Sequence, residues 1–378
     1  MTSHSVIAPS AMARTVQCPA SVVAGVMYPE GAPTADAEVG TAQHEVAAEA
    51  TRHAARGETL PPSTVGTLAS NNVPVTDEMY RAALGYAREI QSVMQTTGVF
   101  TPHIEERVDV PRVHEVCFGT PDCWLYAPQE QTLWVWDNKF GYRPHNPKLH
   151  WSLMAYAAGI LDALGPDDRN VKVSLSIYQP RLPHKQGPAR SWSCMGWELR
   201  PYINQMAAAA DEALGPDPKY RTGPECRDCR ASHACDALRW SNFAAIDAVS
   251  KTPPADMDSL GMGTELKILR KFREQLDARV SGLEAQIEQT IAGGGVVPYW
   301  VLDRPPGRLN WTKPVHEVIA LGDALGVDVR KPEAPITPTQ AIAAGLDAAI
   351  INDGYAKRTP GKTKLTEDTT QETLDNAN

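Results

Sequence analysis

The residues of this chain best suited to catalysis are His44, Asp122, Asp137 and Lys139. Carboxylate oxygens are hard ligands for Mg²⁺ or Mn²⁺, and an imidazole nitrogen shifts the preference somewhat towards Mn²⁺. Asp137 and Lys139 are two residues apart, so both side chains project from the same face of a strand. The ammonium group can then orient water or stabilise charge on a phosphate. Singly, such residues are usually a solvated strand end or a structural histidine. Together they predict divalent-metal phosphodiester chemistry.

A second group of residues could bind a metal through sulphur. Cys226, Cys229 and Cys235 lie within ten residues, and Cys18 is the best candidate for a fourth ligand. Four cysteines suit a [4Fe–4S] cluster or a structural zinc ion. Zinc ribbons normally have two paired Cys-x-x-Cys motifs and this chain has one, which favours the cluster. His233 offers a local Cys₃His zinc site as the alternative.

The overall composition is that of a globular protein. The chain has 378 residues, of which 42% are hydrophobic, 21% are charged and 31 are prolines. No apolar run is long enough to span a bilayer, and the N-terminus lacks the basic start and apolar stretch of a secretory signal. We therefore expect a cytoplasmic protein with no membrane partner, in which the seven cysteines do not form a disulfide framework.

The net charge of −9 argues against a nucleic-acid partner, because phosphate contacts usually come from a basic face. Net charge averages over the whole chain, however, and the carboxylates of a metal site and an acidic tail both lower it. Local basic stretches occur at residues 143–148, 181–190 and 267–273. The first of them contains Arg143 and Lys148, which are candidates for contacts with DNA.

The predicted elements bring the catalytic candidates together. Thr41 is the predicted N-cap of a helix over residues 42–56 that ends at Gly57, which places His44 in its first turn. Asp122 begins one predicted strand and Asp137 ends the next, so a hairpin would bring both to one end of a sheet. Further helices are predicted at 77–94 and 148–164, and strands at 104–110, 115–118, 122–126, 132–136 and, half-buried, 171–177. This order predicts an α/β fold with a mixed sheet flanked by helices.

The remainder of the chain is predicted to form a separate region. Pro253-Pro254 marks a boundary after a first domain at residues 1–250. A long amphipathic helix then runs to Gly293 and carries one apolar face, whose predicted role is packing. That face contains Leu266, Leu269, Leu276, Leu283, Ile287 and Ile291. Residues 251–356 are predicted to be helical and α+β, and residues 357–378 to be a polar, disordered tail.

These motifs resemble those of the RecB-type branch of the PD-(D/E)XK nuclease superfamily, in particular of members with a carboxy-terminal iron–sulphur clasp. The chain is similar to the exonucleases of CRISPR adaptation and to AddB-type helicase-nucleases, and more closely to phage-encoded proteins of unassigned function. The matching segments are Cys18-Pro19, residues 40–45, 119–122 and 137–141, and the cysteine triplet. They cover roughly the first two-thirds of the chain, which implies a restriction-endonuclease-like core.

The resemblance implies a role for each residue of the metal site. His44, Asp122 and Asp137 would bind Mg²⁺ or Mn²⁺, together with the backbone carbonyl of Asn138. Lys139 would assist catalysis. An aspartate in place of the commoner glutamate at position 137 is a tolerated variation in the superfamily.

The resemblance also implies contacts with DNA and a structural role for the cysteines. Tyr156 matches the tyrosine of the family's Gln-x-x-x-Tyr motif, on the helix after the catalytic strand. Ser152 stands where the family has glutamine, which weakens the case for DNA contacts on this helix. A [4Fe–4S] cluster on the four cysteines would tie the N-terminus to the segment after the core.

The expected function is a metal-dependent DNA exonuclease that hydrolyses phosphodiester bonds from DNA ends, in phage or mobile-element recombination or replication. A phage single-strand annealing or replication protein would be a partner, and the host cytoplasm would be the compartment. One alternative is a non-catalytic DNA-binding or scaffolding protein of the same fold, which the acidic charge and Ser152 favour. The other is a zinc-stabilised interaction protein. The intact combination of His44, Asp122, Asp137 and Lys139 favours the nuclease.

Overall fold

The computed structural model describes residues 5–28, 33–165, 168–251 and 258–302, together with residues 320 and 324. The chain divides into two compact units, residues 1–302 and 303–378. A central sheet and the helices around it belong to the first unit. The boundary predicted at Pro253-Pro254, nearly all of the predicted region after residue 302 and the polar tail lie outside the described residues.

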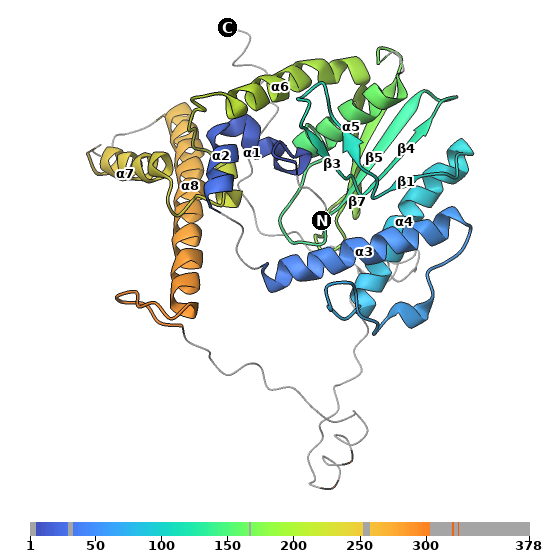
Figure 1. Cartoon of the computed structure of the whole chain (residues 1–378), viewed down its shortest axis with the longest axis horizontal. Helices are drawn as coiled ribbons and strands as arrows, with labels where there is room; N and C mark the ends of the chain where they lie inside the picture. Colours follow the sequence, from blue (N-terminus) through green and yellow to red (C-terminus); the bar gives the residue numbers. More distant parts are fainter. Residues whose placement is uncertain are drawn as a thin grey trace. The chain divides into compact units, whose positions relative to one another are not determined.

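A mixed five-stranded sheet lies at the centre of the first unit, in the order β1-β4-β5-β6-β7 (Figure 1). Strands β5 and β6 run parallel, and the other neighbours pair antiparallel. The strands are β1 (His103–Ile104), β4 (Cys123–Ala127), β5 (Thr132–Asn138), β6 (Lys172–Tyr178) and β7 (Ala189–Met195). Two short strands, β2 (Val108–Asp109) and β3 (Phe118–Gly119), form a separate sheet. The predicted α/β fold with a mixed, helix-flanked sheet is confirmed.

Helices cover both faces of this sheet, because its central strands carry apolar side chains on both faces. Val135 of β5 belongs to a core formed with α1, α5 and α6, whereas its neighbour Trp136 belongs to a core formed with α3 and α4. The α-helices are α1 (Met12–Gln17), α2 (Ala20–Met27), α3 (Ala35–Ala55), α4 (Asp77–Thr97), α5 (Trp151–Leu164), α6 (Arg200–Leu214), α7 (Asp236–Lys251) and α8 (Ser259–Ala292). The 3₁₀ helices are η1 (Pro9–Ala11), η2 (Pro62–Thr64), η3 (Gly196–Leu199) and η4 (Pro224–Asp228).

The helix that carries His44 begins earlier than predicted. α3 starts at Ala35 instead of residue 42, and its N-cap is Thr34, whose hydroxyl accepts a hydrogen bond from the N–H of Ala37 over 3.2 Å. Thr41 lies inside the helix, where its hydroxyl donates to the carbonyl of Ala37. The predictions that Thr41 is the N-cap and that His44 lies in the first turn are therefore wrong. His44 lies in the third turn.

The predicted strand over residues 104–110 is divided into two. β1 pairs with β4 in the central sheet, whereas β2 pairs with β3 in the small sheet. Between them Glu105 has a φ angle of 51°, a left-handed conformation that no regular strand contains. The chain therefore changes from one sheet to the other at this residue.

Strand β6 is buried more completely than predicted, and β7 was not predicted. From Val173 to Tyr178 every residue of β6 is buried, including two serines. Ser176 satisfies its hydroxyl with Ser191 of β7 over 2.8 Å. The half-buried prediction is wrong because the serines that alternate with the apolar residues of β6 are themselves buried. A small hydroxyl with a partner can be buried at little cost.

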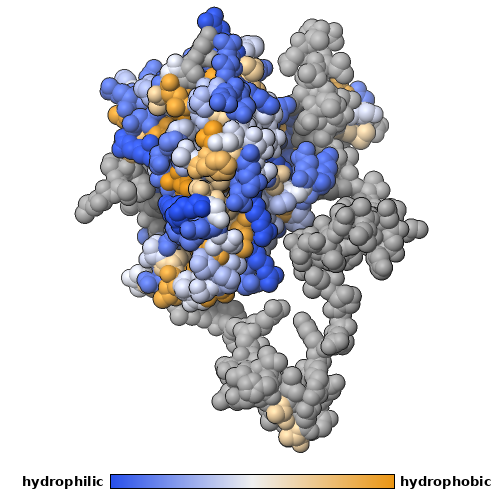
Figure 2. Space-filling view, turned by 90° about the vertical axis from the view of Figure 1, so that its right-hand side faces the viewer, coloured by the Kyte–Doolittle hydropathy of each residue, from blue (hydrophilic) through white to orange (hydrophobic). Residues whose placement is uncertain are grey.

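The long helix α8 is present, but its apolar face is not packed as predicted. Leu269 is 41% exposed and Leu283 is 39% exposed. The exposed apolar side chains of α8 form a stripe along the helix. On the face of the molecule that Figure 2 shows, hydrophobic residues instead occur in small patches between hydrophilic ones. Within the described part of the chain, no helix is both long and apolar enough to cross a membrane.

Candidate metal centre and cysteine cavity

The two aspartates lie next to each other where β4 begins and β5 ends. The two strands form the predicted antiparallel hairpin, in which Cys123 pairs with Trp136. Asp122 and Asp137 occupy the next position along these strands, at the same end of the sheet. The backbone N–H of Asn138 donates to Asp122 Oδ2 over 2.6 Å. This bond fixes the carboxylate of one strand to the backbone of the other.

His44 and Glu105 complete a compact group of possible metal ligands around Asp122. Nδ1 of His44 lies 3.2 Å from Oδ1 of Asp122. One ligand atom from each of the three residues lies within 4.8 Å of the other two, and no other such group occurs among the described residues. Burial disfavours the protonated form of His44, but the Asp122 carboxylate outweighs it and raises the pKa of the imidazole. An imidazole and two carboxylates suit Mn²⁺ or Mg²⁺.

Glu105 has two unusual properties for a surface glutamate. Its left-handed backbone costs about 1–3 kcal/mol for a residue other than glycine. Its N–H is held by the carbonyl of Asp122 at 3.2 Å. Burial, followed by the negative charge of Asp122, raises the pKa of Glu105 to about 7. Backbone strain and a carboxyl group with raised pKa are both concentrated at functional sites.

Asp137 and Lys139 form a partly buried ion pair at the end of β5. Nζ of Lys139 lies 2.9 Å from Oδ1 of Asp137. Burial would raise the pKa of Asp137, but Lys139 outweighs it and holds the pKa below the ordinary value. Burial also opposes the charge on Lys139, yet Asp137 raises the pKa of the ammonium group. Oδ2 of Asp137 is buried and has no hydrogen-bond partner among the described residues, so it can accept a cation.

Two histidines on the segment between β5 and α5 lie near this ion pair. The ring centroids of His145 and His150 are 5.9 Å apart. Burial, with the charge of Lys139 next, lowers the pKa of His145 to about 4. Burial also lowers the pKa of His150, whose buried Nδ1 has no partner in the described part of the chain. Both imidazoles are therefore neutral near pH 7.

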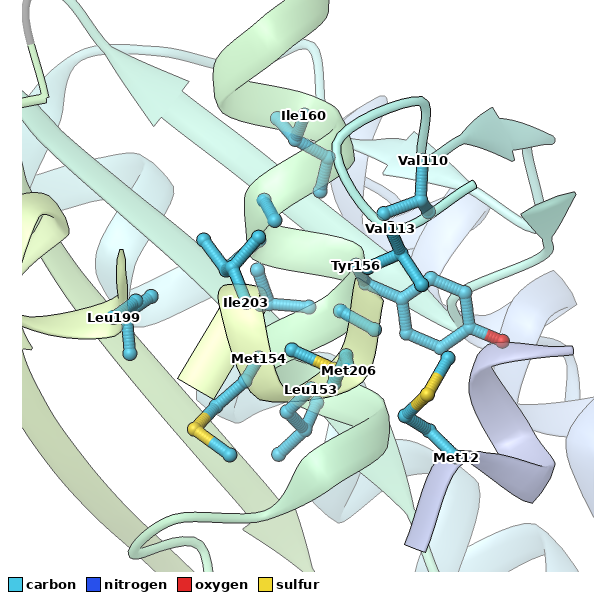
Figure 3. Close-up of a cluster of buried hydrophobic side chains, with 14 of the residues drawn as sticks. Met12, Val110, Val113, Leu153, Met154, Tyr156, Ile160, Leu199, Ile203 and Met206 are labelled. Carbon is cyan, nitrogen blue, oxygen red and sulfur yellow. The ribbon is translucent and has the colours of Figure 1, made fainter. Parts of the chain in front are cut away.

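The four residues predicted to contact DNA lie in different surroundings. Tyr156 is 9% exposed and belongs to the core, where its ring lies beside Met12 (Figure 3). Ser152, at the start of α5, is half-buried. Arg143 and Lys148 are exposed on the segment that follows β5. Of these four residues, Lys148 presents its charge to solvent, whereas the guanidinium of Arg143 is paired with Asp228.

The four cysteines singled out in the sequence line one cavity of about 290 Å³. Cys18 directly follows α1, whereas Cys226 lies in η4 and Cys229 and Cys235 follow it. Burial, with the charges of the other three cysteines as a smaller cause, raises the pKa of Cys226 to about 11. The fold therefore brings the N-terminal cysteine to the distant triplet.

The spacing of the four sulphurs differs from that of a closed zinc site. Within the described residues, no three of them lie within 4.8 Å of one another. Zinc binds thiolates at about 2.3 Å in a tetrahedron, so its ligand sulphurs are roughly 3.8 Å apart. The thiolates of a four-iron cluster bind different irons and are spread more widely. His233, the alternative zinc ligand, packs its ring edge-on against Tyr28, with the centroids 4.9 Å apart.

Each of the four sulphurs has a backbone N–H donor. The donors are Arg221 for Cys18 at 3.4 Å, Gly223 for Cys226 at 3.4 Å, Leu238 for Cys235 at 3.5 Å, and Ala231 for Cys229. Hydrogen bonds of this kind stabilise thiolates and tune the metal centres that thiolates bind. The donor set and the cavity therefore fit a metal group held by four thiolates.

Asp228 connects the cysteine segment to the segment that follows β5. It lies between Cys226 and Cys229, and its carboxylate accepts a hydrogen bond from Arg143. Its backbone carbonyl accepts another from Arg14 of α1. No motif in the sequence distinguishes Asp228, Glu105, His145 or His150. Each is an ordinary polar residue until the fold brings it to its partners.

A family model described as "Protein of unknown function (DUF2800)" matches residues 4–319 of the chain. A solved structure titled "Crystal structure of SSO0001" aligns with 63% of this chain and 89% of its own, at 14% identity and a TM-score of 0.29. A likeness at that score adds nothing to the description of the fold.

Proposed function

The chain belongs to this DUF2800 family, whose function is unknown, and we propose that it is a metal-dependent DNA nuclease that degrades DNA from its ends. The proposal includes a PD-(D/E)XK core, a divalent ion at the His44 site and a [4Fe–4S] cluster at the cysteine cavity. The observation that carries it is the meeting of His44, Glu105 and Asp122 within 4.8 Å, beside the pair of Asp137 and Lys139.

The proposed ligands of the divalent ion are His44, Asp122 and Asp137, with Glu105 added to the set that the sequence indicated. The ion would supply Lewis-acid chemistry and lower the pKa of water. Asp137 fits this role because it stays ionised and keeps one buried oxygen without a partner in the described residues. Lys139 stays cationic beside it and can stabilise negative charge on a phosphate.

DNA would approach across the segment that follows β5. Lys148 is exposed there and can contact a phosphate in spite of the net charge of −9, and Arg143 could do so if it left its pair with Asp228. Tyr156 supports the site from the core, since most of its ring is not available to a ligand. The sequence-derived partners, a phage single-strand annealing or replication protein, remain a prediction.

The proposed cluster would act as a structural clasp. Four sulphurs with backbone donors surround the cavity, and the single Cys-x-x-Cys motif favours a cluster over zinc. Free thiols near a metal group also suit a reducing, cytoplasmic compartment. Zinc is the alternative occupant of the cavity. Metal analysis and the absorption spectrum of anaerobically purified protein would distinguish the two, since iron thiolates absorb visible light and zinc thiolates do not.

The decisive experiment is DNA hydrolysis by full-length, anaerobically purified protein. The substrates are end-labelled linear DNA and covalently closed circles, with Mn²⁺ or with EDTA. We expect degradation of linear DNA alone, lost in EDTA and reduced about a hundredfold or more in Lys139→Ala. The matched control is Lys172→Ala, since Lys172 is exposed at the opposite end of the same sheet and should not matter.

The other outcomes are equally informative. Cutting of closed circles would show endonuclease action and contradict the preference for ends. No hydrolysis by protein with verified metal content would overturn the enzyme proposal. Binding of DNA without hydrolysis would then support the non-catalytic alternative.

A further inference from the structure

Helix α8 is held in place by one of its faces. Ala278 on this face is 1% exposed, and a Cβ added to Gly282 would lie 2.2 Å from Oγ of Ser232. The guanidinium of Arg279 donates to the backbone carbonyls of Ser232 and His233. This face packs on the segment that carries the cysteines.

The opposite face carries a heptad repeat of apolar residues. Leu269 and Ile287 are each nine residues from Ala278, which is two and a half turns and therefore the far side of the helix. We define the α8 seam as the a and d positions of this repeat, which are Met262, Leu266, Leu269, Arg273, Leu276, Val280, Leu283 and Ile287. All except Arg273 are apolar, and Val280 is 44% exposed. In Figure 1, α8 lies beside α7 at one side of the first unit.

Helix α7 extends this apolar surface on one side. Phe243 and Ile246 of α7 are 53% and 56% exposed. With Leu276 and Leu283 of the α8 seam they line a groove of about 200 Å³. A contiguous apolar surface of this kind marks an interaction site on a globular protein.

We propose that the α8 seam binds the α8 seam of a second copy of the chain, as an antiparallel two-stranded coiled coil. Apolar residues at a and d positions over several heptads are the pattern that two such helices bury against each other. An identical surface on both partners closes with twofold symmetry and leaves no seam exposed. The proposal is independent of the nuclease activity, because the seam lies on the face of α8 away from the cysteine segment.

Charge determines the direction of the two helices. In a parallel, in-register pair, Arg273 would face its own copy inside the apolar seam, which is unfavourable. In the antiparallel pair, Arg273 lies beside Leu276 of the second copy. Arg270 then lies beside Asp277 of the second copy. In the described part of the chain, neither Arg270 nor Asp277 has an ion-pair partner of its own.

The first test is the mass of the full-length protein in solution, measured by sedimentation over a range of concentrations. We expect a dimer that Leu269→Glu weakens about a hundredfold or more, because two buried leucines are replaced by charges. The matched control is Ile268→Glu, since Ile268 is 48% exposed on the same helix but lies outside the seam. The proposal is overturned if the wild-type chain is monomeric. It is also overturned if neither substitution changes the affinity of the dimer.

The second test concerns direction and uses exposed residues that cannot affect folding of the core. Arg270→Glu and Asp277→Arg should each weaken the dimer about tenfold, since each creates two like-charge contacts. The double variant restores both contacts with reversed sign and should recover the wild-type affinity. Failure to recover, in a protein that does dimerise through the seam, would contradict the antiparallel arrangement.

Discussion

Asp122 is the residue around which the candidate metal site is organised. Its two carboxylate oxygens contact His44 and the N–H of Asn138, and its backbone carbonyl holds the N–H of Glu105. The side chain and backbone of one residue thus join a helix, a strand end and a strained connection. Substitution of Asp122 would therefore remove the side-chain contacts that hold His44 and the backbone of Asn138.

The protonation of two proposed ligands makes metal binding depend on pH. The pKa of His44 is raised by Asp122, and the pKa of Glu105 is raised to about 7 by burial. Both groups must be unprotonated to bind a metal ion, so protons compete with the metal at low pH. We expect the affinity for Mn²⁺, measured by calorimetry, to fall by up to about tenfold per pH unit below about pH 7 as Glu105 takes up a proton, and to fall more steeply where His44 is also protonated.

Glu105→Gln provides the control for this dependence. The amide cannot ionise, so the variant should bind Mn²⁺ more weakly at pH 8 and with a shallower dependence on pH. Equal affinity of the wild-type protein at pH 6 and pH 8 would show that neither His44 nor Glu105 binds the ion.

At the scale of elements, helix α3 positions the side chain of His44. The helix starts at Ala35, so His44 follows more than two complete turns and is held well inside a regular segment. Its neighbours on the sheet side, Val46 and Ala47, are buried in the core with α4. A histidine near a frayed helix end would be placed less firmly.

The start of α3 can be tested by two similar substitutions. Thr34→Ala removes the N-cap and should lower the free energy of unfolding by about 1 kcal/mol. Thr41→Ala changes an exposed residue inside the helix and should be neutral or slightly stabilising, because alanine has the higher helix propensity. Chemical denaturation of both variants measures the difference, and a larger loss for Thr41→Ala would contradict the helix start.

At the scale of the whole molecule, the cysteine segment joins parts of the chain that are far apart in sequence. It brings Cys18 to Cys226, and Asp228 receives hydrogen bonds from Arg14 and Arg143. Arg143 belongs to the segment that follows β5. A bound metal group would therefore stabilise both the N-terminal helices and the surroundings of the proposed active site.

Two cysteine variants separate the effect of a metal group from that of packing. Cys226 and Cys194 are similarly buried, at 8% and 9% exposed, so replacement by alanine removes a similar amount of buried surface. If the cavity binds a cluster, Cys226→Ala should cost on the order of 4 kcal/mol more, because it opens a long cross-linked loop. Thermal melting with iron analysis measures this, and equal melting temperatures would exclude a stabilising metal group.

The sequence by itself determined the central features that depend on local pattern. Alternating and helical periodicities predicted the hairpin of β4 and β5, the helices α4 and α5 and the mixed sheet, because burial of apolar faces leaves a chain few other choices. It also indicated Asp122 and Asp137 at one end of that hairpin, since register follows from strand pairing.

The tertiary structure alone decided the features that depend on contacts between distant segments. Glu105 is one of two adjacent glutamates, and nothing local distinguishes it from Glu106 until its left-handed backbone brings it to His44 and Asp122. The exposure of the α8 seam was also decided by the tertiary structure. An apolar stripe in the sequence predicts burial but does not specify which segment buries it. Periodicity identifies which faces are apolar, whereas only the packed chain shows which of them are left without a partner.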